Sequence, residues 1–244
     1  MGFLLNDVIV LAKNAEFLVN RNHLFSLGNP ISHVNSRDLK FVLSKHNLKK
    51  FNISEKYLNK AILSDLRKLS LKEKKIISFE YFTKLLNFKK FSSIDIDPKE
   101  LPTFCIDITK KHINDDFISK ADMIYDTGSL GYIKDPIAGL NFLIRLLKIN
   151  GIIVHQSSHN GFIKTGYFQI NISFFIDYYK KKNLEIIYSS YGFFSNWLKY
   201  GFFFNWLKEM ILGKWKLDID ENPNLNRIKK EKNYLYIVSK KKDN

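Results

Sequence analysis

Two apolar runs, each ending in polar residues, constrain the fold of this chain more than any other feature. The first run covers 122–125 and ends in Asp126-Thr127-Gly128, and the second covers 151–154 and ends in His155. The residues between them have the spacing of an amphipathic helix. Strand, loop, helix and strand in this order form a βαβ unit, which predicts two parallel strands in one sheet.

The polar residues after these runs are expected at one edge of the sheet. In open α/β sheets, ligands bind outside the carboxyl ends of the strands, which predicts a site at Asp126, Thr127 and Gly128. The stretch from His155 to Asn160 would reach the same edge. A second interpretation stays open, in which Asp126 and Gly128 only form the turn after a buried strand.

A second unit lies upstream, where a short strand ends in carboxylates. The stretch 91–98 contains Asp95 and Asp97 after the apolar positions, and it follows a helical pattern at 79–88. A carboxylate at a strand tip can accept both hydroxyls of a ribose. We expect Asp95 to do so, with Asp97 as the second choice.

The first strand of such a sheet is expected at 23–27, an apolar run that ends in Gly28-Asn29-Pro30. Later strands are expected at 184–188 and 234–238, with a helix at 174–179. A chain of 244 residues with 45% hydrophobic residues can bury one full core. We therefore predict a single domain, 1–244, with a helical insertion at about 30–75 and an aromatic-rich insertion at about 191–230.

The charge balance is strongly basic, with 39 Lys and Arg against 24 Asp and Glu, for a net charge of +15. Such a balance suits a polyanionic partner. The lysines are scattered in short pairs and triplets, however, and do not form one arginine-rich stripe. We therefore favour solvated faces over nucleic-acid binding, which would instead predict an affinity that falls steeply with salt.

One cysteine, Cys105, excludes an intramolecular disulfide and agrees with a reducing compartment. We expect it to be a buried small residue beside Asp107 rather than a nucleophile. The start of the chain, 1–12, lacks the basic head and apolar core of a signal peptide, and we expect it to belong to the fold. No window has the length of a membrane-spanning helix, so the expected location is the cytoplasm.

A nine-residue segment, 191–199, is repeated at 200–208 with eight of nine positions identical. In a helix, a shift of nine residues rotates the copy by about 180°, so the copies cannot share one face. The repeat is therefore a tandem duplication in a tolerant loop, or a functional aromatic lid. Its tryptophans and lysines would also suit a peripheral membrane contact or a homo-oligomer contact through 191–213.

The order of elements and the strand-tip residues resemble the class I S-adenosylmethionine-dependent methyltransferases. Within that class, four short motifs resemble an uncharacterised bacterial methyltransferase-like group often found among surface-polysaccharide genes. The resemblance covers 79–184 and, loosely, the first strand. The motifs are Tyr125-Asp126-Thr127-Gly128-Ser129-Leu130, Leu146-Leu147-Lys148 with Gly151, His159-Asn160, and Gly166-Tyr167-Phe168-Gln169.

The resemblance implies a Rossmann-like three-layer α/β fold, whose seven-stranded sheet is mostly parallel with an antiparallel last strand. It also implies S-adenosyl-L-methionine over the tips of the first, second and fourth strands. By position, Gly28 and Asn29 would form the methionine-side loop. The other implied cofactor contacts are Asp95 at the ribose, Ile96, Asp107 and Ile108 on the adenine side, and Asp126, Thr127 and Gly128 facing the transferred methyl.

The chain departs from the family pattern at two places. Class I members usually have an acidic residue two positions before the first glycine, and further glycines after it; here Ser26, Pro30 and Ser32 stand instead. The related group usually has Glu-His where this chain has Gly131-Tyr132. These departures favour the alternative function, a catalytically inactive methyltransferase-like partner protein.

Methyl transfer from a sulfonium needs alignment of the acceptor and exclusion of water, but no metal. A hydroxyl or amine acceptor would gain from a base near the methyl group. The candidates are His155, His159 and Asp126, although a histidine near a strand end is more often a satisfied polar residue. Asn160, Tyr167 and Gln169 are the candidates for binding a small-molecule or saccharide acceptor. A nicotinamide dehydrogenase is disfavoured because the repeated-glycine fingerprint is absent.

Overall fold

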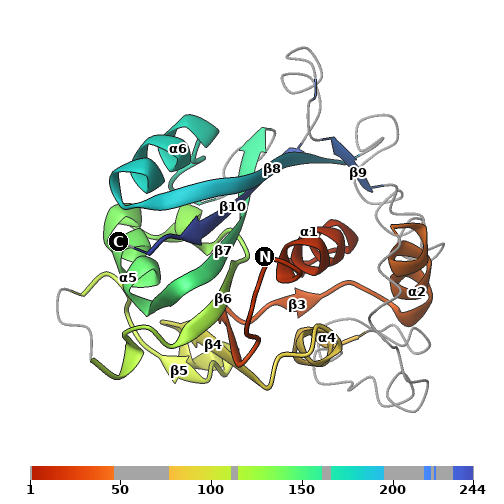
Figure 1. Cartoon of the computed structure of the whole chain (residues 1–244), viewed down its shortest axis with the longest axis horizontal. Coiled ribbons are helices and arrows are strands. Elements are labelled where there is room, and N and C mark those ends of the chain that lie inside the picture. The colour runs from red at the N-terminus through yellow and green to blue at the C-terminus, as the bar shows by residue number, and fades with distance from the viewer. Residues whose placement is uncertain are drawn as a thin grey trace.

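The chain folds around a mixed β-sheet with helices on both faces (Figure 1). The computed structural model describes residues 2–46, 77–110, 115–160, 166–194, 217–220, 223 and 233–243. Within these residues the main sheet has eight strands in the order β5-β4-β2-β6-β7-β10-β8-β9. The strands are β2 (His23–Leu27), β4 (Lys90–Asp95), β5 (Phe104–Cys105), β6 (Ala121–Asp126), β7 (Leu147–Asn160), β8 (Leu184–Phe194), β9 (Leu217–Asp220) and β10 (Asn233–Lys241).

The strand directions confirm the predicted fold class. Each neighbouring pair from β5 to β7 is parallel, whereas β10, the last strand of the chain, runs antiparallel to both β7 and β8. The short β9 adds one more antiparallel pair, with β8. The result is a Rossmann-like α/β sheet that is mostly parallel and has an antiparallel last strand.

Two layers of helices cover the two faces of the sheet (Figure 1). One layer holds α1 (Leu5–Ala15), α2 (Ser36–Lys45) and α4 (Phe79–Leu85), together with a small parallel pair of β1 (Gly2–Phe3) and β3 (Ile31–Ser32). The other layer holds α5 (Pro136–Leu146) and α6 (Ile172–Lys181). Short 3-10 turns lie at η2 (Pro98–Glu100), η3 (Asp115–Phe117) and η4 (Ser129–Tyr132).

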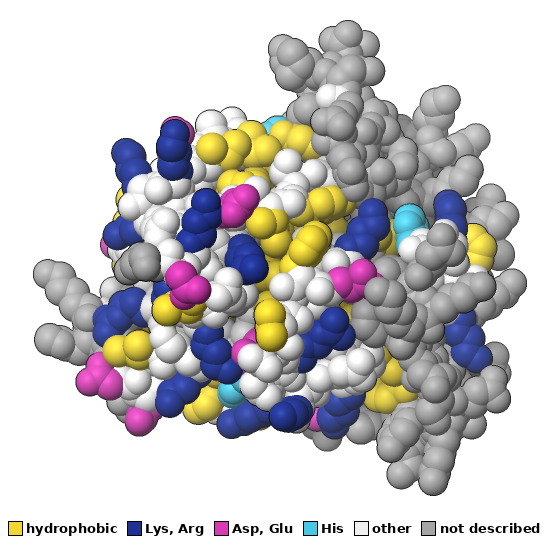
Figure 2. Space-filling view, in the orientation of Figure 1, with side chains coloured by type: hydrophobic (Ala, Val, Ile, Leu, Met, Phe, Trp, Pro, Cys, Tyr) yellow, Lys and Arg dark blue, Asp and Glu magenta, His cyan; other side chains and the backbone are white. Residues whose placement is uncertain are grey.

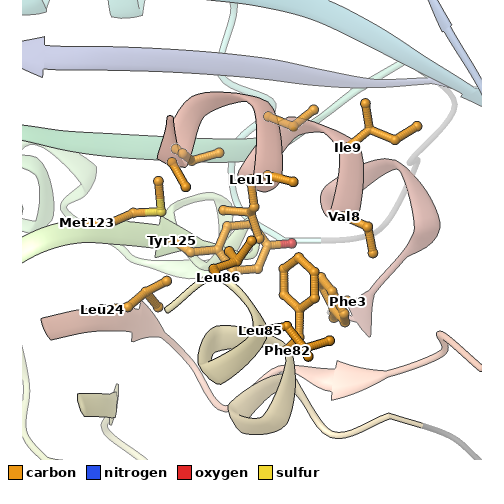
Figure 3. Packing of buried hydrophobic residues seen from close by; sticks show 14 of the residues in the cluster. Phe3, Val8, Ile9, Leu11, Leu24, Phe82, Leu85, Leu86, Met123 and Tyr125 are labelled. Carbon is orange, nitrogen blue, oxygen red and sulfur yellow. The ribbon is translucent and has the colours of Figure 1, made fainter. Parts of the chain in front are cut away.

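Each face of the sheet has its own hydrophobic core. On the α1 side, Val8 and Leu11 pack over Met123 and Tyr125 of β6, next to the aromatic ring of Phe3 (Figure 3). On the α5 and α6 side, the core is built on the alternate residues of the same strands. Its fully or almost fully buried members include Phe25, Ile124, Leu140, Leu143, Ile153, Phe175 and Ile237.

The helix starts are set by side chains that satisfy free backbone N–H groups. Asn35 accepts from Asp38 N at 2.8 Å, and Ser78 accepts from Tyr81 N at 3.1 Å. Asp135 accepts from Ala138 N at 2.9 Å, with Pro136 as the first helical residue of α5. These local signals explain why α2, α4 and α5 lie close to the helical patterns of the sequence.

The beginning of the chain belongs to the fold, as predicted, because α1 buries Val8, Val10 and Leu11 completely. In contrast, the expectation of a buried Cys105 is wrong. Cys105 is exposed on the short edge strand β5, where its thiol lies 3.4 Å from Ile96 O. The edge strand β5 pairs with β4 through only two residues, Phe104 and Cys105.

The two predicted insertions lie mostly outside the described residues. In the first, α2 agrees with the predicted helical character of the insertion, and the chain is next described from Ile77. In the second, β8 continues through Phe194, so the first four residues of the duplicated segment extend a strand. The rest of that duplication, 195–208, is not among the described residues, and its predicted roles stay predictions.

Charged side chains are dispersed over the visible face of the described residues (Figure 2). Lys and Arg are spread over this face among acidic, apolar and uncharged polar groups. In the described part of the chain, no helix is both long and apolar enough to cross a membrane.

Candidate functional site

The candidate site lies where the chain reverses direction across the sheet. From β2 the chain continues to β4 and β5 on one side, and then crosses to β6 and β7 on the other. Leu27, the last residue of β2, is level with Ile94 on β4 and with Asp126 on β6. The carboxyl ends of β4, β2 and β6 therefore meet at a topological switch point, the place where open α/β sheets bind their ligands.

Gly28 occupies the centre of this edge. Its backbone has φ +83°, a left-handed conformation that strongly favours glycine, and its N–H donates to Ile94 O at 2.7 Å. A Cβ atom here would lie 3.0 Å from Ser129 Oγ and 3.5 Å from Thr127 Oγ1. The same position is 3.8 Å from Asp95 Oδ2. The bare glycine thus faces the polar side chains of both neighbouring strands.

Asp95 is half-buried at the tip of β4 and uses one carboxylate oxygen locally. Its Oδ1 accepts from Asp97 N at 3.0 Å, whereas its Oδ2 is the oxygen near Gly28. Ile96, the next residue, is 65% exposed and therefore presents an apolar side chain to solvent beside the carboxylate. Asp97, the second choice for a ribose contact, instead accepts from Lys99 N and begins η2.

The residues predicted for the two ends of the cofactor, Asn29 on the methionine side and Asp107 and Ile108 on the adenine side, differ in their surroundings. Asn29 is exposed, and its amide donates to Glu100 O at 3.0 Å, which links the loop after β2 to η2. Asp107 accepts from the backbone N–H and the hydroxyl of Thr109, at 3.0 and 2.6 Å. These hydrogen bonds lower the pKa of the Asp107 carboxyl. Ile108 is buried and packs in the α5-side core.

The loop after β6 is held by Asp126 from one side and by β2 from the other. Asp126 Oδ1 accepts from Gly128 N at 3.0 Å and from Ser129 N at 2.8 Å, which is the hydrogen-bond pattern of a tight turn. The hydroxyls of Thr127 and Ser129 each donate to Leu27 O, at 3.1 and 3.0 Å. The loop therefore has a fixed position against the β2 tip.

His155 is fully buried and has hydrogen-bond partners at both ring nitrogens. Nδ1 lies 2.8 Å from Asp126 Oδ2, and Nε2 is hydrogen-bonded to the hydroxyl of Tyr179 on α6. Its ring packs against Phe175, with the ring centroids 4.7 Å apart. Because His155 and Asp126 are 0% and 1% exposed, neither side chain faces solvent at the edge. This geometry favours the interpretation of His155 as a satisfied polar residue.

His159 and Asn160 are half-buried at the far end of β7, beyond the buried histidine. The His159 ring contacts Tyr191 edge-on, with centroids 5.4 Å apart. Asn160 pairs with Asn233 at the end of β10. Of the three residues predicted as a base, His159 is the one whose side chain is not completely enclosed.

The segment after β7 returns to the loop after β6. Gly131 O accepts from the N–H groups of Tyr167 and Phe168, at 2.6 and 3.0 Å. A Cβ atom at Gly131 would lie 2.8 Å from Phe168 O, so this close approach explains the glycine at this position. Tyr132, Tyr167 and Phe168 are 48%, 64% and 44% exposed, and Gln169 is also exposed.

Two residues of the site are absent from the predicted set. Ser129 belongs to one of the four motifs but not to the predicted contacts, and its hydroxyl donates to Leu27 O. Tyr179 was assigned to a helical pattern, and nothing in its neighbourhood signals a contact with His155. That contact joins residues 24 positions apart on different elements.

No family model and no curated protein matches this chain. Among solved structures, a Galdieria sulphuraria protein, provisionally a sarcosine dimethylglycine methyltransferase, has a TM-score of 0.49 and 9% identity over 98% of this chain and 85% of its own. TehB from Haemophilus influenzae has a TM-score of 0.47 and 12% identity over 97% of this chain. Phosphoethanolamine N-methyltransferase 2 of Haemonchus contortus, in complex with S-adenosyl-L-methionine, has 0.45 and 11% over 98% of this chain. The chain spans 62% and 53% of the latter two proteins.

Proposed function

We propose that this protein is an S-adenosylmethionine-dependent methyltransferase that acts on a small or saccharide acceptor in the cytoplasm. One observation carries the proposal: Gly28, Asp95 and the loop 127–129 converge at the switch point of a mostly parallel sheet whose last strand is antiparallel. The position a Cβ would take on Gly28 is within 4 Å of a side chain from each neighbouring strand tip. Because Gly28 has no Cβ, a ligand can approach its backbone closely at this position.

The residues at this edge fit the cofactor in a consistent order. Oδ2 of Asp95 would accept the ribose hydroxyls, and the exposed side chain of Ile96 would cover a face of the adenine. Gly28 and Asn29 would lie against the methionine part, and Thr127 and Gly128 against the methyl. Asp107 and Ile108 would contribute mainly through their backbone, because their side chains are engaged in a turn and in the core.

When bound, the cofactor supplies an activated methyl group on a sulfonium. The chain would align the acceptor with that methyl and exclude water. For a hydroxyl or amine acceptor, His159 is the base that we favour, because His155 and Asp126 are enclosed and hydrogen-bonded to each other. Asn160, at the end of the same strand, would orient the acceptor.

Thermal unfolding with the cofactor product S-adenosylhomocysteine tests the site directly. A ligand at one hundred times its dissociation constant adds about 2.7 kcal/mol to the free energy of unfolding. We expect this stabilisation for the wild type and its loss in Asp95→Ala, because the ribose hydroxyls lose their acceptor. Asp97→Ala is the matched control, since this neighbouring carboxylate serves η2. Equal stabilisation of both variants would remove Asp95 from the site, and none for the wild type at millimolar ligand would contradict the proposal.

A flat-faced acceptor, such as a sugar ring, fits the aromatic residues beside the methyl-side loop. Tyr132 follows that loop within η4, and its ring contacts Gly166, with 3.7 Å between Tyr132 Cδ1 and the position of a Cβ there. Tyr167 and Phe168 are fixed to Gly131 by their backbone and expose their rings. Stacking on these rings, with Gln169 as a hydrogen-bonding partner, supports a saccharide acceptor of the surface-polysaccharide type.

A panel of nucleotide sugars with labelled S-adenosylmethionine tests the acceptor class. We expect Tyr167→Ala to raise the acceptor KM about fivefold, since one ring contact contributes about 1 kcal/mol. The affinity for S-adenosylhomocysteine should stay unchanged. Phe17→Ala removes an aromatic side chain of similar exposure, 57%, after α1, and should change neither value. An acceptor KM that is the same in Tyr167→Ala as in the wild type would exclude this residue from the acceptor site.

A second function is favoured by the enclosure of His155 and Asp126. A catalytically inactive relative needs the cofactor edge but no base, and it would serve as a partner protein. Binding of S-adenosylhomocysteine without methyl transfer to any acceptor, and unchanged by His159→Ala, is the result that this function predicts. A partner contact through 191–213 belongs to the same proposal.

A further inference from the structure

Three buried polar side chains from three elements form a chain of hydrogen bonds behind the candidate site. Asp126 ends β6, His155 lies on β7 beside it, and Tyr179 lies near the end of α6. Their exposed fractions are 1%, 0% and 0%. Polar groups this deeply buried are costly unless all of them are paired, so the arrangement is specific.

The partners of His155 indicate which atom donates and which accepts in each of these hydrogen bonds. With Asp126 Oδ2 as the acceptor, Nδ1 of His155 carries the ring hydrogen in this tautomer and donates to Oδ2 at 2.8 Å. Nε2 of His155 then accepts from the hydroxyl of Tyr179. Burial raises the pKa of that phenol, which keeps its proton in place. Every step therefore has one donor and one acceptor.

The chain continues from Asp126 into the loop proposed to face the cofactor methyl. The other carboxylate oxygen, Oδ1, accepts from the N–H groups of Gly128 and Ser129, at 3.0 and 2.8 Å. The Ser129 hydroxyl in turn donates to Leu27 O, next to Gly28. The hydrogen bond from His155 orients the carboxylate plane of Asp126. That orientation in turn sets the position of the loop.

We propose that His155 and Tyr179 are positioning residues for the loop 127–129. They hold the Asp126 carboxylate in the one orientation from which Oδ1 can accept both loop N–H groups, and so they set the shape of the cofactor edge from α6. The consequence for ligand affinity rests on the proposed function. The consequence for the loop itself does not, because it follows from the hydrogen bonds between Asp126 and the loop alone.

Tyr179→Phe tests the inference, because it removes the hydroxyl and keeps the ring. We expect the amides of Gly128 and Ser129 to exchange with deuterium at least tenfold faster in the variant, and the Kd of S-adenosylhomocysteine to rise three- to tenfold. Phe175→Leu is the matched control: Phe175 packs on the His155 ring but donates no hydrogen bond to it. This variant should lower the melting temperature, with the Gly128 and Ser129 exchange and the Kd unchanged at 15 °C.

Three other outcomes are decisive. Equal exchange of Gly128 and Ser129 in Tyr179→Phe and wild type, or equal acceleration by Phe175→Leu, would overturn the inference and leave a merely structural role. Faster exchange in Tyr179→Phe, with no ligand binding by the wild type, would support the positioning role and contradict the proposed function.

If Tyr179→Phe does not fold, His155→Gln is compared with His155→Leu. The Gln amide can still donate to Asp126, so we expect the Gly128 and Ser129 amides to exchange more slowly in His155→Gln than in His155→Leu. Equal exchange in these two variants would again overturn the inference.

Discussion

Replacing Asp7 by Asn is expected to stabilise the protein by about 4 kcal/mol at pH 8 and by almost nothing at pH 4. Asp7 is fully buried in α1, and this burial raises its pKa from 3.8 to about 7, more than the hydrogen bond from Leu4 N lowers it. The shift of about three units corresponds to about 4 kcal/mol. The folded state thus holds a proton that the unfolded state releases above pH 3.8, so the contribution of Asp7 to stability falls as the pH rises from about 4 to about 7.

Urea denaturation at pH 4, 6 and 8 measures this effect as the difference between Asp7→Asn and wild type. The difference is required because His23, whose pKa is lowered to about 4 by burial and by nearby lysines, changes stability in the opposite direction over part of this range. Leu4 N donates to Asp7 Oδ2 at 2.5 Å, and the amide oxygen of Asn can accept the same hydrogen bond. Asp177→Asn, an exposed carboxylate on α6, is the control and should give no such trend. A constant difference across the three pH values would show that Asp7 titrates at its ordinary pKa.

Gly28→Ala is expected to weaken binding of S-adenosylmethionine at least about tenfold, or 1.4 kcal/mol, and to lower the free energy of unfolding by about 1–2 kcal/mol. The stability loss follows from φ +83°, where a Cβ is strained against its own backbone. The affinity loss follows from the space itself, because the new methyl group would contact Ser129 Oγ at 3.0 Å and stand between the tips of β4 and β6. The new methyl group would lie close to side chains at the tips of both neighbouring strands, Asp95 at the end of β4 and Ser129 after β6.

Calorimetric titration and urea denaturation of the same sample separate the two losses. Gly151→Ala is the matched control, since a Cβ there would also meet a neighbour closely, at 2.8 Å from Leu147, but in the first half of β7 and away from the strand tips. This control should change stability without changing the affinity for S-adenosylmethionine. If Gly28→Ala binds the cofactor as tightly as wild type, the cofactor does not lie across the β2 tip.

Much of the fold was predictable because its signals are local. The apolar runs at 23–27, 91–94 and 121–125 alternate or continue as buried strands do, and each ends in Gly or Asp at the edge. The helix starts carry their own capping residues, such as Asp135 before Pro136. These features depend on residues within a few positions of one another, so reading them requires no knowledge of the packing.

The candidate site was predictable only in part. The strand-tip rule brought Gly28, Asp95 and Thr127 into one set, and the structure places them around one point. The same rule could not tell which tip residues face solvent. Asp126 and His155 stand at the same edge but turn toward α6, because alternate residues of a strand point to opposite faces.

Turn chemistry and hydrophobic period act over short distances along the chain, and they were enough to predict where the main strands end. The antiparallel direction of the last strand was implied by the family resemblance alone. The exposure of Cys105, the burial of Asp7 and the hydrogen bond between Tyr179 and His155 became known only from the tertiary structure. Each of these depends on which elements pack together across the sheet. Contacts between residues far apart in the chain arise from the joint burial of many side chains, and no local pattern encodes them.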